Sequence, residues 1–138
     1  MERLKSSILD SFSQVDREQA DALLAEEAAR SRRKIVVLDD DPTGVQTVHG
    51  VSVYTDWSVE SIREGFAEEN KLFFILTNSR GFTVEQTTRA HREIGERVDQ
   101  VAKETGWDYL IISRGDSTLR GHYPLETELL KEEAEKAN

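Results

Sequence analysis

Four short apolar runs, separated by stretches with helical periodicity, constrain the fold of this chain more than any other feature of its sequence. The runs cover residues 35–38, 51–54, 72–76 and 109–112. Short, β-branched runs without regular polar alternation are typical of strands that are buried on both faces of a parallel sheet. Helical segments are expected from about 58 to 69, from 83 to 105 and from 124 onward. This alternation predicts a three-layered α/β fold, with a mostly parallel sheet of at least four strands and flanking helices.

Residues that favour helix ends lie where these helices are expected to begin and end. Asp16 precedes Gln19 by three residues, which predicts an N-cap. Thr83 precedes Gln86 by three residues, which predicts a capping box. Gly106 follows the helix that Thr83 begins, and glycine is the residue that most often ends a helix.

The N-terminal 33 residues differ from the remainder of the chain. Their apolar side chains recur at helical spacing, and no strand pattern is present. The segment ends in a basic cluster that we expect to be a solvated helix end, made of Arg30, Arg32, Arg33 and Lys34. We therefore predict a helical segment over residues 1–33 and a second domain over residues 34–138.

Charge and composition exclude several classes of function. The formal net charge is −9, whereas nucleic acids and anionic membranes are bound by basic surfaces, so neither is an expected partner. The chain has no cysteine, which excludes disulfides and zinc–thiolate sites. It shows neither a signal-peptide core nor an apolar run of roughly 20 residues, so we expect a cytoplasmic protein. The sequence contains neither the phosphate-binding pattern Gly-x-x-x-x-Gly-Lys-Ser/Thr nor the dinucleotide-binding pattern Gly-x-Gly-x-x-Gly.

The three histidines carry little information about the site. His49 follows the first polar motif described below, and His122 follows the last one, so either could support a site. His91 lies on a polar helix, where we expect it to be solvated. Their spacing does not match a metal-binding triad, so no metal site is predicted in this chain.

A dense acidic motif follows the first predicted strand. It begins with Asp39, Asp40 and Asp41 and continues through Pro42 to Thr43 and Gly44. In open α/β sheets, ligands bind at the carboxyl ends of the strands. Adjacent carboxylates raise one another's pKa, and one of them could act as a general base toward a hydroxyl group. The alternative is a structural role in turn formation and helix capping.

Two further polar motifs follow the third and fourth predicted strands. The segment 77–81 offers Ser79 and Arg80, although Arg80 could simply extend into solvent. The segment 113–121 is richer, and arginine can bind a carboxylate through two parallel hydrogen bonds. A salt bridge between an aspartate and an arginine within this segment is the structural alternative. Its candidate site residues are Arg114, Asp116, Ser117, Arg120 and Gly121.

Taken together, the segments 38–44, 77–80 and 116–121 resemble the four-carbon acid sugar kinase family, which includes threonate, erythronate and 3-oxo-tetronate kinases. The resemblance extends over residues 34–130, and the Asp-Ser-Thr-Leu-Arg-Gly block at 116–121 is its most specific part. Members of this family have an N-terminal half that binds the sugar acid and a C-terminal half that binds ATP. The resemblance therefore implies that this chain is the substrate-binding half of an ATP-dependent phosphotransferase, inactive by itself.

The resemblance also implies roles for the residues of the three motifs. Asp39 or Asp40 is expected to orient a substrate hydroxyl group and accept its proton, and Arg120, with Arg80 or Arg114, is expected to hold the carboxylate of the sugar acid. ATP and Mg²⁺ are expected to bind mainly to the absent C-terminal domain, which lies in the same chain or in a separate one. Self-association of the chain is left open. The residues expected to bind substrate are Thr43, Gly44, Ser79, Arg80, Arg114, Asp116, Ser117, Arg120 and Gly121.

The sequence departs from the family pattern at two places. Residues 113–115 read Ser-Arg-Gly where many members have lysines, and the loop after Gly44 returns quickly to a strand where many members have a helix. The identity of the acid is therefore left open.

Two other functions compete with the kinase interpretation. Haloacid-dehalogenase-like phosphatases share an Asp-x-Asp-x-Thr opening, which Asp39, Asp41 and Thr43 match. However, Arg120 stands where their second acidic residue is expected, and no lysine occurs between residues 78 and 103. The third alternative is a sugar-acid-binding protein that acts alone.

Overall fold

The computed structural model describes residues 5–13, 15–46, 48–116 and 120–137. The chain divides into two compact units, Met1–Ser31 and Arg32–Asn138. In the first unit, a 3₁₀ helix, η1 (Ser6–Ser11), precedes helix α1 (Arg17–Arg30). The predicted N-cap is confirmed, since the Asp16 side chain accepts a hydrogen bond from the Gln19 N–H. None of the residues of α1 is buried.

The second unit is an α/β domain, as predicted. Its four strands form one sheet in the order β2-β3-β1-β4, and all three pairings are parallel. A short 3₁₀ helix, η2 (Ser79–Gly81), follows the third strand. The strands are β1 (Arg33–Asp39), β2 (Val53–Tyr54), β3 (Leu72–Leu76) and β4 (Asp108–Arg114), and the helices are α2 (Val59–Ala67), α3 (Val84–Thr105) and α4 (Leu125–Ala137).

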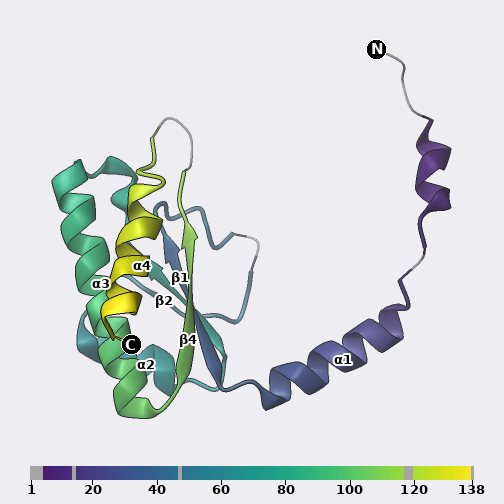
Figure 1. The fold of residues 1–138 in the computed structure, drawn as a ribbon, viewed down its shortest axis with the longest axis horizontal. Helices are drawn as coiled ribbons and strands as arrows, with labels where there is room; N and C mark the ends of the chain where they lie inside the picture. Colours follow the sequence, from purple (N-terminus) through teal and green to yellow (C-terminus); the bar gives the residue numbers. More distant parts are fainter. Residues whose placement is uncertain (1–4, 14, 47, 117–119, 138) are drawn as a thin grey trace. The chain divides into compact units, whose positions relative to one another are not determined.

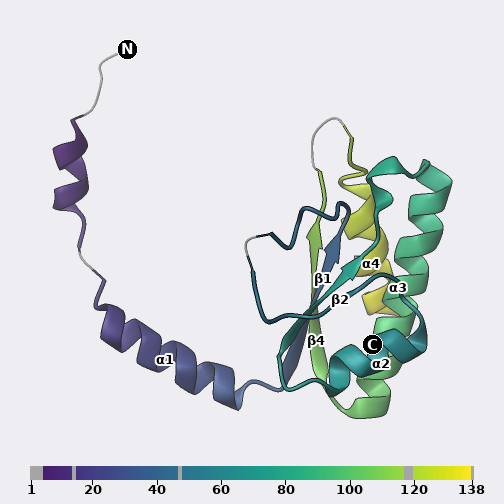
Figure 2. The ribbon, with the colours of Figure 1, turned by 180° about the vertical axis from the view of Figure 1, so that it is seen from behind.

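Strand order explains where the helices of this unit lie. The connections from β2 to β3 and from β3 to β4 cross the sheet in the same direction, so right-handed crossovers place α2 and α3 on the same face. Figure 1 shows these two helices on one side of the sheet, together with α4, which packs on α3. The connection from β1 to β2 crosses the sheet in the opposite direction, and Figure 2 shows it on the other side.

The core lies between the sheet and its helices. Val36 and Phe73 of the sheet pack in one buried cluster with Phe66 of α2 and with Ile94 and Val98 of α3. The predicted ends of α3 are confirmed: Thr83 and Gln86 form a capping box, and Gly106 ends the helix in the left-handed conformation. No helix in the described part of the chain is long and apolar enough to cross a membrane.

Lys34 departs from the sequence-based expectation. The basic cluster is predicted to be solvated, but for Lys34 this is wrong, because its side chain is fully buried. Its Nζ donates hydrogen bonds to the carbonyl oxygens of Glu68 and Asn70, both at 2.6 Å, and lies 5.3 Å from the centre of the Trp107 ring. The carbonyl groups at the end of a helix lack helical partners, so a cation is stabilised there. Burial lowers the pKa of Lys34.

Candidate functional site

The three polar motifs lie on neighbouring strands. β1 is hydrogen-bonded to β3 on one side and to β4 on the other, and Asp39 at its end is in register with Leu76 and with Arg114. Because the strands are parallel, the segments that follow them leave the sheet at the same edge. The structure therefore brings the acidic motif between the two arginine-bearing motifs.

Asp39 has one oxygen atom without a hydrogen-bond partner. The side chain is 1% exposed, and its Oδ1 accepts from the Asp41 N–H and from Arg114 Nη1, both at 3.4 Å. Its Oδ2 is buried and has no partner in the described part of the chain. Burial raises the pKa of this carboxyl, and the hydrogen bond from Asp41 and the charge of Arg114 offset only part of the rise. A buried carboxylate with a raised pKa and a vacant oxygen is suited to accept a proton.

Asp40 is in a different environment, because both of its oxygens are engaged. Arg80 binds it through two parallel hydrogen bonds, from Nη2 to Oδ1 at 2.8 Å and from Nε to Oδ2 at 3.1 Å. The Asp116 N–H donates to Oδ2 at 3.0 Å. Asp40 thus joins the motifs that follow β1, β3 and β4, and we call these contacts of Asp40 with Arg80 and Asp116 the junction. Both oxygens of its carboxylate are occupied by these internal hydrogen bonds.

Asp41 and Thr43 form a tight turn beside this junction. The N–H and the hydroxyl of Thr43 both donate to Asp41 Oδ1, and Arg80 Nη1 donates to Oδ2 at 2.7 Å. The hydrogen bond from the Thr43 side chain is the largest cause of the lowered pKa of Asp41. Arg80 therefore bridges two adjacent carboxylates, which engages three of its five N–H donors.

Gly44 lies against the Asp39 carboxylate. It is buried, and a β-carbon placed on it would collide with all three atoms of the Asp39 carboxyl group. Only glycine permits this approach, so the turn over residues 42–46 covers Asp39.

The motif after β3 has one residue directed inward and one directed at the junction. Ser79 is 1% exposed, and its hydroxyl lies 2.9 Å from that of Thr77, which donates to the Asp39 carbonyl oxygen. Asn78 adopts a left-handed conformation with φ of 52° at the turn. Ser79 is thus part of the base of the site, whereas Arg80 reaches the acidic motif.

The motif after β4 supplies the two exposed guanidinium groups of the site. Arg114 is 48% exposed and contacts Asp39 at 3.4 Å, and Arg120 is 67% exposed and contacts Asp116 at 3.3 Å. These are their only ion pairs in the part of the chain that the structure describes. Gly121 approaches the Asp116 carbonyl closely, since a β-carbon there would overlap it. Ser117 lies outside the described residues.

His91 and Glu126, which sequence reasoning did not assign to the site, form a buried pair next to the third motif. His91 is predicted to be solvated, but this is wrong, because it is 2% exposed and its Nε2 lies 3.8 Å from the buried Glu126 Oε1. A β-carbon on Gly115 would lie 2.9 Å from Glu126 Oε2, so this pair lies directly beneath the third motif. His122, a candidate from the sequence, places its Nε2 3.0 Å from the Phe82 carbonyl oxygen and so holds this motif beside the second. His91 is buried because α4 packs on α3, and a contact between two helices cannot be predicted from the periodicity of one of them.

The site lies at the carboxyl ends of the strands of an α/β domain, where the buried Asp39 is contacted by the exposed Arg114 and the exposed Arg120 belongs to the same motif as Arg114. Comparison with known proteins gives this domain a family. A family model described as "sugar-binding N-terminal domain" matches residues 35–138. The chain therefore belongs to this family of sugar-binding domains, and its partner is a small sugar molecule. No curated protein and no solved structure matches the chain.

Proposed function

We propose that this domain binds a short-chain sugar acid, such as a four-carbon aldonate, and is the substrate-binding half of an ATP-dependent kinase. One observation carries the proposal: the exposed guanidinium group of Arg114 contacts the buried carboxylate of Asp39, whose Oδ2 has no partner among the described residues, and the exposed Arg120 belongs to the same motif as Arg114. A ligand with a carboxylate and hydroxyl groups matches this combination of charges.

Arg114 and Arg120 are better suited than Arg80 to hold the carboxylate. Arg80 is bound by Asp40 and Asp41 through three hydrogen bonds, so a ligand would have to displace an internal partner. Among the described residues, Arg114 and Arg120 each form one long ion pair, so they can turn toward a ligand at small cost. Arg80 is then a positioning residue that fixes the acidic motif.

Asp39 is the residue that accepts the proton of the substrate hydroxyl group. The raised pKa of Asp39 is closer to neutral pH than that of an exposed aspartate, and no donor in the described residues would have to leave its Oδ2. Gly44 lies over this carboxylate, so the turn over residues 42–46 must shift to admit the hydroxyl group. Asp40 cannot take this role without releasing Arg80 and the Asp116 N–H.

In this proposal, ATP and Mg²⁺ bind mainly to a second domain. The oxygens of Asp40 and Asp41 accept hydrogen bonds from Arg80, Thr43 and Asp116, and no group of three potential ligands is arranged around a common point in the described ranges. ATP bound to a second domain would supply the phosphoryl group. The residues of this chain would hold the acceptor hydroxyl group in place, which is a large part of catalysis in phosphoryl transfer.

The proposal is tested by isothermal titration calorimetry of the 138-residue chain with threonate and erythronate, with the uncharged polyol erythritol as control. Both acids should be tested, because the stereochemistry is left open by the sequence. At least one acid should bind, and erythritol should bind more weakly than that acid. The chain alone should form no phosphorylated acid from ATP. Absence of binding by both acids would refute the assignment, and Mg²⁺-dependent release of phosphate from a phosphate ester would favour the phosphatase instead.

A further inference from the structure

The packing of α3 against α4 buries two titratable side chains that the proposed function does not use. His91 belongs to α3, and Glu126 belongs to the first turn of α4. Both are buried, and Nε2 of His91 lies 3.8 Å from Oε1 of Glu126. A buried charge is costly unless an opposite charge or a hydrogen-bond donor compensates it. The number of protons that the pair holds therefore determines how well it is tolerated in the interior.

The contact of the second ring nitrogen fixes the tautomer of His91. Nδ1 lies 2.9 Å from the carbonyl oxygen of Thr87, one helical turn earlier in α3. A carbonyl oxygen only accepts hydrogen bonds, so Nδ1 must carry a hydrogen atom and donate it. In a neutral ring with this tautomer, Nε2 has a lone pair and no hydrogen atom. That lone pair would face the carboxylate of Glu126, and two acceptors repel each other.

We infer that the pair of His91 and Glu126 retains one proton at neutral pH, held between Nε2 and Oε1, and that this proton fixes the position of the third motif. With the proton, the pair is an imidazolium beside a carboxylate or an imidazole beside a carboxylic acid. In either form the two groups attract each other, and the pair has no net charge. Without the proton, an ionised carboxylate would be buried against a lone pair, which is strongly unfavourable.

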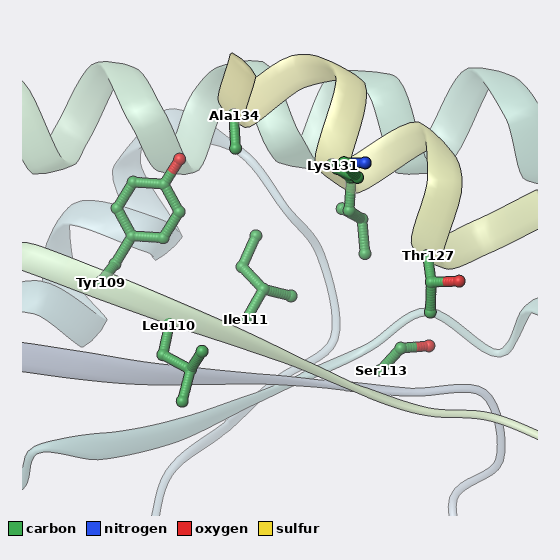
Figure 3. Close-up of a pocket in the computed structure, with 8 residues that line it drawn as sticks. Tyr109, Leu110, Ile111, Ser113, Thr127, Lys131 and Ala134 are labelled. Carbon is green, nitrogen blue, oxygen red and sulfur yellow. The ribbon is translucent and has the colours of Figure 1, made fainter. Parts of the chain in front are cut away.

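The first turn of α4 lies against the start of the third motif. Figure 3 shows Thr127, which follows Glu126, beside Ser113 of β4, and both residues line the groove between β4 and α4. A β-carbon on Gly115 would lie 2.9 Å from Oε2 of Glu126 and 3.9 Å from Oδ2 of Asp40. The two carboxylates therefore flank the same point of the backbone.

No other cation forms an ion pair with Glu126 among the described residues. The carboxylate of Asp40 is bound by Arg80. Arg92, which follows His91 in α3, is engaged by two acidic residues of α4. These residues are Glu132 and Glu133, and Glu133 also contacts Lys136. Loss of the shared proton would therefore place an uncompensated negative charge beside Asp40.

The resulting repulsion would act on the backbone that positions the exposed arginines. Arg114 directly precedes Gly115, and Asp116 directly follows it. Asp116 is in turn paired with Arg120. The buried pair is thus a positioning device for the two guanidinium groups that we expect to hold the carboxylate of the ligand. This consequence rests on the proposed function, whereas the shared proton is tested without a ligand.

Nuclear magnetic resonance of the isotope-labelled full chain locates the proton directly. At pH 7.5, the nitrogen chemical shifts of the His91 ring show which nitrogens carry hydrogen, and the carbon shift of the Glu126 carboxyl group shows whether it is protonated. We expect hydrogen on Nδ1 and one further proton on Nε2 or on Glu126. The exposed His49 is the reference for a neutral ring, because a free imidazole is mostly neutral at this pH. His49→Gln and His122→Gln assign the signals, since each removes one histidine.

Glu126→Gln removes the need for the shared proton, because a glutamine amide can donate a hydrogen bond to Nε2. The ring of His91 should then be neutral, with its hydrogen on Nδ1. Glu128→Gln is the matched control, because Glu128 is exposed in the same turn of α4. This control should leave the shared proton in place.

The effect on the third motif is tested by the pH dependence of ligand binding. Calorimetry with threonate and erythronate is carried out from pH 7 up to the pH at which the magnetic resonance signals show the proton to leave. Over this range the wild type and Glu128→Gln should lose affinity by about 5-fold or more, as is typical of coupling between two sites. Glu126→Gln has no shared proton to lose, so its affinity should change by less than about 2-fold.

Three results would overturn the inference. The first is a neutral His91 ring beside an ionised Glu126 in the wild type. The second is a ring that carries hydrogen on both nitrogens in Glu126→Gln. The third is an acid whose affinity has the same pH dependence in the wild type and in Glu126→Gln, which would refute the role of the proton in positioning the arginines. If neither acid binds at any pH, the proposed function fails, and the magnetic resonance result still decides whether the proton is present.

Discussion

Replacement of Asp39 with asparagine should make the folded domain more stable at neutral pH while removing the proposed base. The reason is the carboxylate's environment: it is 1% exposed, and its Oδ2 has no partner in the described residues. Asparagine has nearly the same shape, and its oxygen can keep the hydrogen bonds that Asp39 Oδ1 accepts from Asp41 and Arg114. The substitution therefore removes a buried charge and little else.

The magnitude follows from the polar groups around the carboxylate. An unpaired buried polar atom costs about 1–3 kcal/mol, and more when it is charged. Asparagine retains an unpaired atom, now neutral, and loses the attraction of Arg114, which is nearly half exposed and lies 3.4 Å away. It is also relieved of the repulsion from Asp40. We expect the free energy of unfolding to rise by about 1 kcal/mol at pH 7.

The gain should depend on pH in a defined direction. The pKa of Asp39 is raised in the folded state, so the folded wild type binds this proton more tightly than the unfolded chain. As pH rises from the usual aspartate value of 3.8 through the raised pKa, the wild type loses stability relative to the variant. The advantage of Asp39→Asn should be complete above the raised pKa and absent below 3.8.

Urea unfolding of both proteins between pH 3.5 and 7.5 measures this difference, with a shift in the midpoint of roughly 1 M expected at pH 7. Asp41→Asn is the matched control, since the pKa of Asp41 is lowered by the Thr43 hydrogen bonds and its removal should reduce stability at pH 7. The effect of Asp41→Asn should hold down to about pH 3.8 and begin to fade only below it, because the pKa of Asp41 is lowered from that value. An Asp39→Asn variant that is less stable than wild type at pH 7, or whose advantage does not change with pH, would refute the assignment of Asp39 as a destabilised acid.

Two further substitutions test the local packing. Gly44→Ala should destabilise the domain by about 1–3 kcal/mol in urea unfolding, because the added β-carbon collides with Asp39. Gly81→Ala is the control: its β-carbon would have no neighbour within 4 Å, so the free energy of unfolding should change by less than about 0.5 kcal/mol. Lys34→Met should cost about 2–4 kcal/mol in the same assay, because the two charge-assisted hydrogen bonds that Lys34 donates to the carbonyl groups of Glu68 and Asn70 are lost. A loss below about 1 kcal/mol would show that these carbonyl groups find other partners.

The fold could be predicted largely from local patterns. The strand at 72–76 coincides with β3, and the runs at 35–38 and 109–112 lie within β1 and β4. The second strand is shorter than expected, Val53–Tyr54 instead of 51–54, because it pairs only with β3 at the outer edge of the sheet. Caps at Asp16 and Thr83 could be predicted because they depend on residues three positions apart.

The partners within the site could not be predicted, because they depend on strand order. Only the central position of β1 between β3 and β4 brings Asp40 to Arg80 and Asp39 to Arg114. The ion pair of Asp116 and Arg120 is the structural alternative offered for the segment 113–121, and local spacing could identify it because both residues lie within that segment. Sequence alone left Asp39 and Asp40 equivalent, whereas their hydrogen bonds separate a vacant acid from a fully bound one.

The central claim is that one edge of the sheet binds the carboxylate of a sugar acid through the arginines of the third motif. The most direct measurement compares an acid with its uncharged polyol, threonate or erythronate against the matching tetritol, in the wild type and in Arg120→Ala. The wild type should bind the acid more tightly than the polyol, and Arg120→Ala should reduce that preference by about 10- to 100-fold without changing polyol binding. An unchanged preference in Arg120→Ala would show that the carboxylate lies elsewhere and would contradict the account.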